Sequence, residues 1–202
     1  MTEADQLLEQ VRNGDSSAVG LLLDRHRLQL RKMVSLRLDA RITGRVDPSD
    51  VVQETLSEAA KRLNDYLESR QIPFYPWLRQ IAWEKLIQTH RRHIGSRKRS
   101  AAREAELPIH LSDESVASLS RIAVSRQESP SEQIVRAELY RRTAEALERL
   151  RPSWKELLIM KYVEQMSVAD IAATLEISAG AVSMRHLRAV EALRKELNES
   201  EL

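Results

Sequence analysis

Basic side chains gather in two stretches of the 202-residue chain, and both stretches suit contacts with phosphate. They are Arg91, Arg92, Arg97, Lys98, Arg99 and Arg103 in the first, and Arg185, Arg188, Arg194 and Lys195 in the second. Acidic side chains cluster elsewhere, at Asp47, Asp50, Glu54 and Glu58, and at Asp113 and Glu114. The formal net charge is only +2, so the distribution of charge is more informative than its sum. Segregated charge allows one chain to meet an anionic and a cationic partner at once.

The histidines do not form a metal site or an enzyme centre in the sequence. His90 and His93 lie three apart, a spacing that suits a metal ion, but arginines flank both and no acidic ligand accompanies them. The sequence has no Gly-rich phosphate loop, nucleophile elbow or carboxylate pair in an apolar setting. It also has no cysteine, which excludes thiolate metal sites and fits a reducing compartment. We therefore predict no enzymatic activity, no cofactor and no metal.

Helices are predicted to position these side chains, because apolar residues recur at intervals of three and four. Hydrophobic residues make up 42% of the chain and aromatic residues 4%, and runs of alternating β-branched residues are missing. We expect an all-α fold of two small helical domains, residues 1–95 and 132–202, joined by a flexible linker over 96–131. The linker is rich in serine and charge, poor in periodicity, and contains Pro108 and Pro130.

The amino terminus is acidic and has no apolar stretch, so it does not resemble a signal peptide. No uncharged run approaches the ~20 residues needed to span a bilayer. We expect a cytoplasmic protein.

Residues 167–193 predict two helices separated by a short turn. Ser167 is placed to cap the first helix, with Asp170 at the capping-box position, and Ser178 to cap the second. Glu176 occupies a turn position that often requires a left-handed residue, which costs a non-glycine residue on the order of 1 kcal/mol. The pattern favours a helix-turn-helix that enters a major groove; a helical hairpin that only fills a core is the alternative. His186 falls on the inward face, which favours a core histidine over a DNA contact.

In the first half, Asp47 and Pro48 predict the start of a helix. Its apolar stripe leaves Asp50, Gln53 and Glu54 facing outward, and a solvated acidic first turn is the simplest interpretation of these residues. Residues 18–38 predict another helix with one apolar face.

Aromatic residues surround the segment "SRQIPFYP" that follows this helix, namely Tyr66, Phe74, Tyr75, Trp77 and Trp83. Aromatic faces stabilise unstacked bases by about 1–3 kcal/mol each, so the segment suits single-stranded nucleic acid. Core packing is the favoured interpretation for Trp77 and Phe74, and the two interpretations are evenly balanced for Tyr75.

The stretch "LERLRPSWKELLIMKYVEQMSVADIAATLEISAGAVSMRHLRAVEALRKEL" resembles region 4 of bacterial RNA polymerase sigma factors of the extracytoplasmic-function (ECF) group. The stretch "DPSDVVQETLSEAAKRLNDYLESRQIPFYPWLRQIAWEKLIQTHRRH" is similar to their region 2. The two matched stretches together cover just under half of the chain, in the order that the family has. The resemblance implies a transcription initiation factor whose partners are core RNA polymerase, through its clamp coiled coil and flap, and promoter DNA. An anti-sigma protein is a further candidate partner, and the chain is expected to be a monomer in the holoenzyme.

The resemblance also implies roles for individual residues. Polymerase docking falls on Asp50, Gln53 and Glu54, which would meet a basic coiled coil. Capture of the melted minus-ten element falls on Arg70, Tyr75, Arg79, Trp83, Lys85, Arg91 and Arg92. Reading of the minus-thirty-five element falls on Ser178, Ala181, Ser183, Met184, Arg185, Leu187 and Arg188. Trp83 and Glu84 stand where relatives usually carry Arg and Asn, and small or apolar residues replace familiar polar ones on the second helix, so the sequence read is expected to be atypical.

A stand-alone helix-turn-helix regulator is the alternative function. It would explain residues 132–202 but would leave the acidic face and the aromatic segment of the first half without a role.

Overall fold

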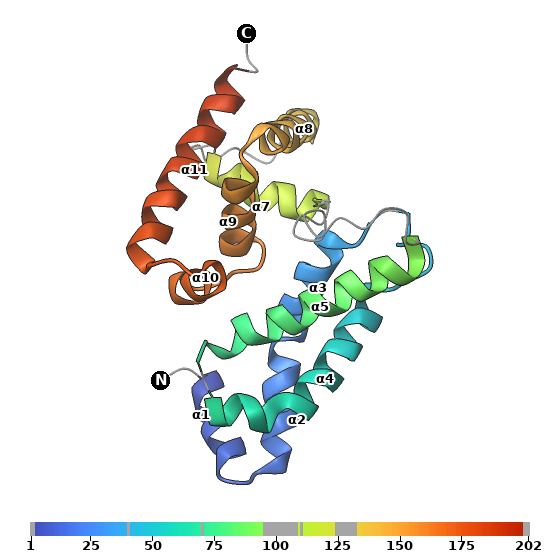
Figure 1. The fold of residues 1–202 in the computed structure, drawn as a ribbon. Helices are drawn as coiled ribbons and strands as arrows, with labels where there is room; N and C mark the ends of the chain where they lie inside the picture. The colour runs from blue at the N-terminus through green and yellow to red at the C-terminus, as the bar shows by residue number, and fades with distance from the viewer. Residues whose placement is uncertain are drawn as a thin grey trace. The chain divides into compact units, whose positions relative to one another are not determined.

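The computed structural model describes residues 3–39, 41–69, 71–94, 109, 111–123 and 133–199. All regular elements in these ranges are helices (Figure 1), so the prediction of an all-α fold is confirmed. The chain divides into two compact units, Met1–His110 and Leu111–Leu202. None of the helices described is both long and apolar enough to cross a membrane.

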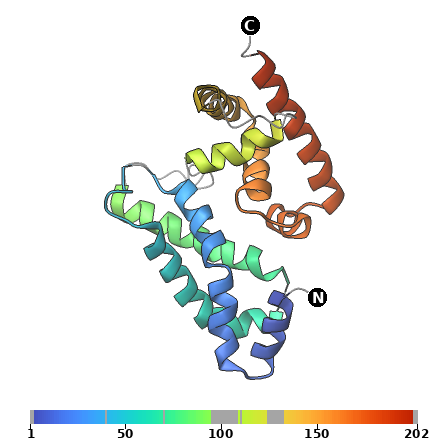
Figure 2. The ribbon, with the colours of Figure 1, turned by 180° about the vertical axis from the view of Figure 1, so that it is seen from behind.

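The described residues of unit 1 form five helices. They are α1 (Glu3–Arg12), α2 (Ser16–Arg25), α3 (Arg27–Arg37), α4 (Pro48–Ser69) and α5 (Phe74–Ile94). The long helices α4 and α5 pack along each other, and α3 packs against both (Figures 1 and 2). The predicted helix over 18–38 is in fact two, because α2 ends and α3 begins at His26.

Helix α4 begins where the sequence predicts. The Asp47 carboxylate accepts a hydrogen bond from the Ser49 amide at 2.7 Å, and Pro48 is the first helical residue. Every third or fourth side chain from Val52 onward is buried, up to Tyr66. This burial fixes the rotation of the helix about its axis, and so determines which side chains reach solvent.

Unit 2 also contains five helices among the described residues. They are α7 (Asp113–Ala123), α8 (Gln133–Arg149), α9 (Pro152–Tyr162), α10 (Val168–Leu175) and α11 (Ala179–Glu199). Helix α11 runs along α8 and α9, and α10 packs on both α9 and α11 (Figure 1).

Helix α7 lies inside the segment predicted as a linker, and there the structure differs from the prediction. Val116 and Leu119 are buried, and α7 packs against α8, α9 and α11. Two serines are buried with them: Ser120 donates to the Ala117 carbonyl at 3.1 Å, and the Ser115 hydroxyl lies 3.0 Å from that of Ser112. Because serine can satisfy its hydroxyl locally, a serine-rich segment here forms a packed helix despite its polar composition.

The turn between α10 and α11 contains the left-handed residue that the sequence suggests. Glu176 has φ 54° and ψ 40°. We expect Glu176→Gly to raise the free energy of unfolding by about 1 kcal/mol, because glycine adopts this conformation without steric cost. Glu191→Gly, in the middle of α11, is the matched control and should lower it by a similar amount. Urea unfolding followed by circular dichroism measures both, and equal signs for the two variants would contradict the strain.

Candidate nucleic-acid interface

Two side-chain caps position the helices on either side of the turn. The Ser167 hydroxyl accepts from the Asp170 amide at 3.0 Å, and the Asp170 carboxylate accepts from the Ser167 amide at 3.4 Å, which completes the predicted capping box. The Ser178 hydroxyl accepts from the Ala181 amide at 3.1 Å and caps α11. Ile171 is 0% exposed and anchors α10 in the core of unit 2. The geometry is that of a helix-turn-helix.

The first turns of α11 separate a buried face from an exposed one. Val182, Ala189 and Leu193 are buried. The positions that the sequence assigns to DNA contact are exposed, except that Arg185 is half-buried: Ser178, Ala181, Ser183, Met184, Leu187 and Arg188. The Ser183 hydroxyl donates to the Ala179 carbonyl of its own helix at 3.1 Å, which leaves its oxygen free to act only as an acceptor.

A hydrogen bond connects α11 to α9 on the inward side. The Tyr162 hydroxyl lies 2.6 Å from Nε2 of His186, and the two rings are 5.6 Å apart. The structure therefore places His186 against the core of the unit, as the spacing suggests. Burial, and to a lesser extent the charge of Lys161, lowers the pKa of His186 below its usual value of 6.5.

This pKa predicts an acid-sensitive unit 2. Because the unfolded chain retains the higher pKa, it binds the proton first as the pH falls, and the contribution of His186 to stability is lost below about pH 6.5. Above that pH both states are neutral and the contribution is constant. We expect His186→Gln to flatten the loss of stability between about pH 7.5 and pH 5.5. Hydrogen exchange of the α9 and α11 amides, compared between wild type and variant at each pH, measures the loss of stability. An equal loss of protection in both proteins would contradict a role for His186.

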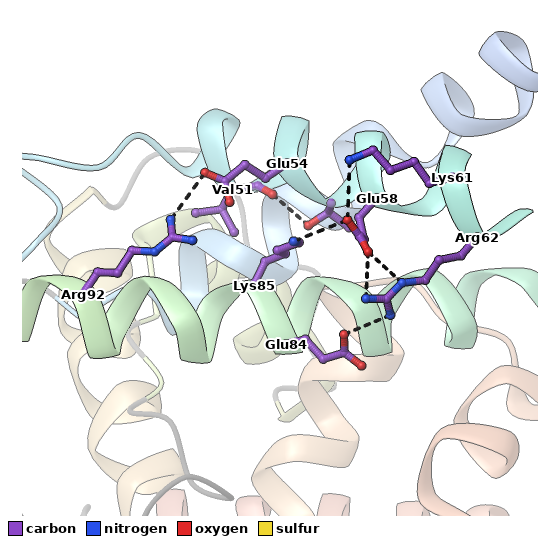
Figure 3. Close-up of polar contacts among 9 residues, drawn as sticks. Val51, Glu54, Glu58, Lys61, Arg62, Glu84, Lys85 and Arg92 are labelled. Carbon is purple, nitrogen blue, oxygen red and sulfur yellow. Dashed lines mark hydrogen bonds and ion pairs between the residues drawn. The ribbon is translucent and has the colours of Figure 1, made fainter. Parts of the chain in front are cut away.

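The acidic face predicted in unit 1 is on the surface. Asp50, Gln53 and Glu54 are all exposed on the first turns of α4. The Gln53 side-chain carbonyl accepts from Arg27 at 3.0 Å, and a carboxylate oxygen of Glu54 lies 3.9 Å from Nη1 of Arg92 on α5 (Figure 3).

Ion pairs continue along the line where α4 meets α5 (Figure 3). Glu58 is 2.8 Å from Arg62, 3.7 Å from Lys85 and 4.0 Å from Lys61, and Arg62 also reaches Glu84 at 3.2 Å. The hydrogen bond from Arg62 is the main cause of the lowered pKa of Glu58. Lys85 and Arg92, both assigned by sequence to DNA, thus contact carboxylates of α4 here.

Other residues of the predicted minus-ten site belong to the interior. Tyr75 is 4% exposed, and its ring stacks on His26 at 5.6 Å. Arg79 is 7% exposed, and its guanidinium lies 5.8 Å from the centre of the Trp83 ring. Neither side chain presents a surface to DNA in this conformation, which differs from the prediction. Arg91 is exposed and Trp83 half-buried, whereas Arg70 lies outside the described residues.

Sequence reasoning missed Arg37, which is completely buried. Its Nη1 donates to the Met33 carbonyl at 3.0 Å, and its guanidinium lies 5.5 Å from the centre of the Trp83 ring. Trp83 therefore has two arginines near its ring, at distances typical of cation–π contacts. An arginine in the largely apolar segment from Met33 to Leu38 is the sequence feature that could have indicated this burial. No group of three potential metal ligands occurs in the part of the chain that the structure describes.

The fold and this surface define a protein of the helix-turn-helix class. A family model described as "Sigma-70, region 4" matches residues 140–193. The chain is 25% identical over 191 residues to the ECF RNA polymerase sigma-E factor of Haemophilus influenzae, covering 95% of this chain and 93% of the relative. It is 26% identical to the ECF RNA polymerase sigma factor SigW of Bacillus subtilis, covering 95% of both chains, and 28% identical to the RNA polymerase sigma-H factor of Pseudomonas aeruginosa, covering 95% and 92%.

A chain in the solved structure of CnrH in complex with the cytosolic domain of CnrY is similar, with a TM-score of 0.54 and 25% identity, covering 98% of this chain and 99% of the matched chain. The chain is thus similar over most of its length to ECF sigma factors, and residues 140–193 match region 4 of the sigma-70 family.

Proposed function

We propose that this protein is a transcription initiation factor that binds core RNA polymerase and directs it to specific promoters. The observation that carries the proposal is the combination of an exposed acidic face on α4 with a capped helix-turn-helix in the second unit. Relatives named as sigma factors align with 95% of the chain. A stand-alone regulator would account for the second unit alone.

Unit 1 is the proposed docking unit for the polymerase. Asp50, Gln53 and Glu54 would meet the basic coiled coil of the polymerase clamp, where complementary charge speeds association and disfavours wrong partners. Their exposure supports this role. Unit 2 would contact the polymerase flap.

Capture of the melted minus-ten element is assigned to the exposed and half-buried residues of α5, namely Trp83, Lys85, Arg91 and Arg92. Cations at these positions would hold the DNA backbone. Lys85 and Arg92 would exchange their carboxylate partners on α4 for phosphates. Tyr75 and Arg79, which are buried, would support this surface from beneath.

Reading of the minus-thirty-five element is assigned to α11. The exposed face of its first turns would enter the major groove, with Arg188 as the exposed cation of that face and Arg185 beside it.

The cellular setting follows from the same proposal. The protein would act in the cytoplasm, as one copy in the holoenzyme. CnrH is known in complex with the cytosolic domain of CnrY, and we infer that an anti-sigma protein restrains this chain in a comparable way.

In vitro transcription tests the function. Core polymerase is mixed with the full chain and a genomic template library, and start sites are mapped. We expect initiation at a small set of sites sharing two sequence boxes, and weak DNA binding by the chain without core. Initiation no more selective than that of core alone would refute the proposal, and tight, specific duplex binding by the free chain would favour a stand-alone regulator.

A further inference from the structure

Large apolar side chains are exposed at four positions in the part of the chain that the structure describes. They are Leu21, Leu28, Met184 and Leu187. Two of them, Met184 at 52% exposure and Leu187 at 51%, lie three residues apart on α11. Side chains at this spacing are neighbours on a helix surface, so they form one apolar patch on the face that the helix-turn-helix presents.

The rest of this face offers few hydrogen-bond donors. Ala181 has no polar side-chain atom, and the Ser183 proton is used within the helix, on the Ala179 carbonyl. Arg188, one residue beyond the patch, is exposed and supplies a guanidinium. A helix of this composition can recognise apolar groups in a groove and place the exposed Arg188 beside them, with the half-buried Arg185 nearby.

The major groove contains one apolar group on an unmodified base edge, the C5 methyl of thymine. Three residues of α-helix rise about 4.5 Å, which is close to the ~3.4 Å between successive bases on one strand. Met184 and Leu187 can therefore reach methyl groups on neighbouring base pairs.

We propose that Met184 and Leu187 read thymine methyl groups at two adjacent base pairs of the minus-thirty-five element. This inference rests on the proposed function and specifies which DNA unit 2 selects. Arg188 holds the helix in register through a phosphate or a guanine. Specificity at the two pairs arises from burial of methyl groups rather than from hydrogen bonds.

Replacing thymine by deoxyuracil tests the proposal, because it removes the methyl and leaves base pairing intact. A promoter selected by the reconstituted holoenzyme is synthesised with single dT→dU changes across its upstream box. We expect open-complex formation to fall about fourfold at each of two neighbouring positions, the effect of one buried methyl group, and to stay unchanged at the others.

Two variants assign the methyl groups to side chains. Met184→Gln keeps the length of the side chain and Leu187→Asn its shape, and each should abolish the deoxyuracil effect at one position while leaving the other. Leu21→Asn, the same change at an exposed leucine of α2, is the control and should alter neither.

Deoxyuracil without effect at every upstream position, with selective initiation intact, would overturn the methyl reading and leave the proposed function standing. Failure of selective initiation on unmodified templates would overturn both. If Met184→Gln and Leu187→Asn instead changed core binding or the oligomeric state and kept the deoxyuracil response, the patch would be a protein contact and the methyl reading would be wrong.

Discussion

Glu54→Lys is expected to weaken binding of the chain to core RNA polymerase by about thirtyfold or more. Losing one partner of a desolvated interface charge pair costs about 2 kcal/mol or more, which corresponds to that factor, and the reversed charge adds repulsion against a basic coiled coil. Glu54 is exposed, so the variant should fold normally. Fluorescence anisotropy of labelled protein titrated with core enzyme measures the change.

Glu68→Lys provides the matched control, since Glu68 is an exposed glutamate near the other end of the same helix. Fourteen residues separate the two positions, which is about 21 Å along the helix axis. The control should bind core almost as wild type does. An equal loss of affinity for core in both variants would show that only the net charge of unit 1 affects binding. Wild-type affinity of Glu54→Lys would show that Glu54 is not part of the docking surface.

Ile171→Ala is expected to lower the free energy of unfolding of unit 2 by about 2–5 kcal/mol, the range for truncating a fully buried isoleucine. Ile171 holds α10 against its neighbours, and α10 supports the angle at which α11 leaves the turn. We therefore expect initiation from promoters that need the minus-thirty-five box to fail well below the temperature at which the wild type fails. Transcription assayed over a temperature series measures this.

Ile171→Val is the milder variant for comparison, because loss of one methylene should lower the free energy of unfolding by only about 0.5–1.5 kcal/mol. Core binding through unit 1 should persist in both variants. If Ile171→Ala lost core binding as completely as it lost minus-thirty-five dependence, the assignment of docking to unit 1 would need revision.

Local signals in the sequence predict the helix starts well. Asp47, Ser167 and Ser178 each cap the helix that they were expected to cap, because a cap depends on residues only two or three positions apart. The break at His26 and the packed helix α7 were missed. Both depend on how distant segments pack. The sequence does not show that the Ser115 and Ser120 hydroxyls find partners within the helix, so the serines of α7 resemble those of a linker.

The exposed faces of the candidate site were equally predictable from helical periodicity, as the positions of Glu54 and Met184 show. The partners of these faces were not. Glu58 contacts Lys85 and Glu54 contacts Arg92, and both pairs join α4 to α5. Helical periodicity relates residues within one helix, so it does not predict contacts between two helices. Burial of Tyr75 likewise depends on His26, which belongs to a different part of the chain.

Glu54 already pairs with Arg92, so a basic partner that binds Glu54 has to compete with that arginine for the same carboxylate. An incoming basic partner has to displace or share the chain's own arginine, and an exposed pair of this kind opposes it by only about 0.2–1 kcal/mol. Nucleic acid that occupied Arg92 would remove that opposition, and by reciprocity polymerase bound at Glu54 would release Arg92. The two ligands would thus assist each other to a small degree, and the assistance would fade as ionic strength rises.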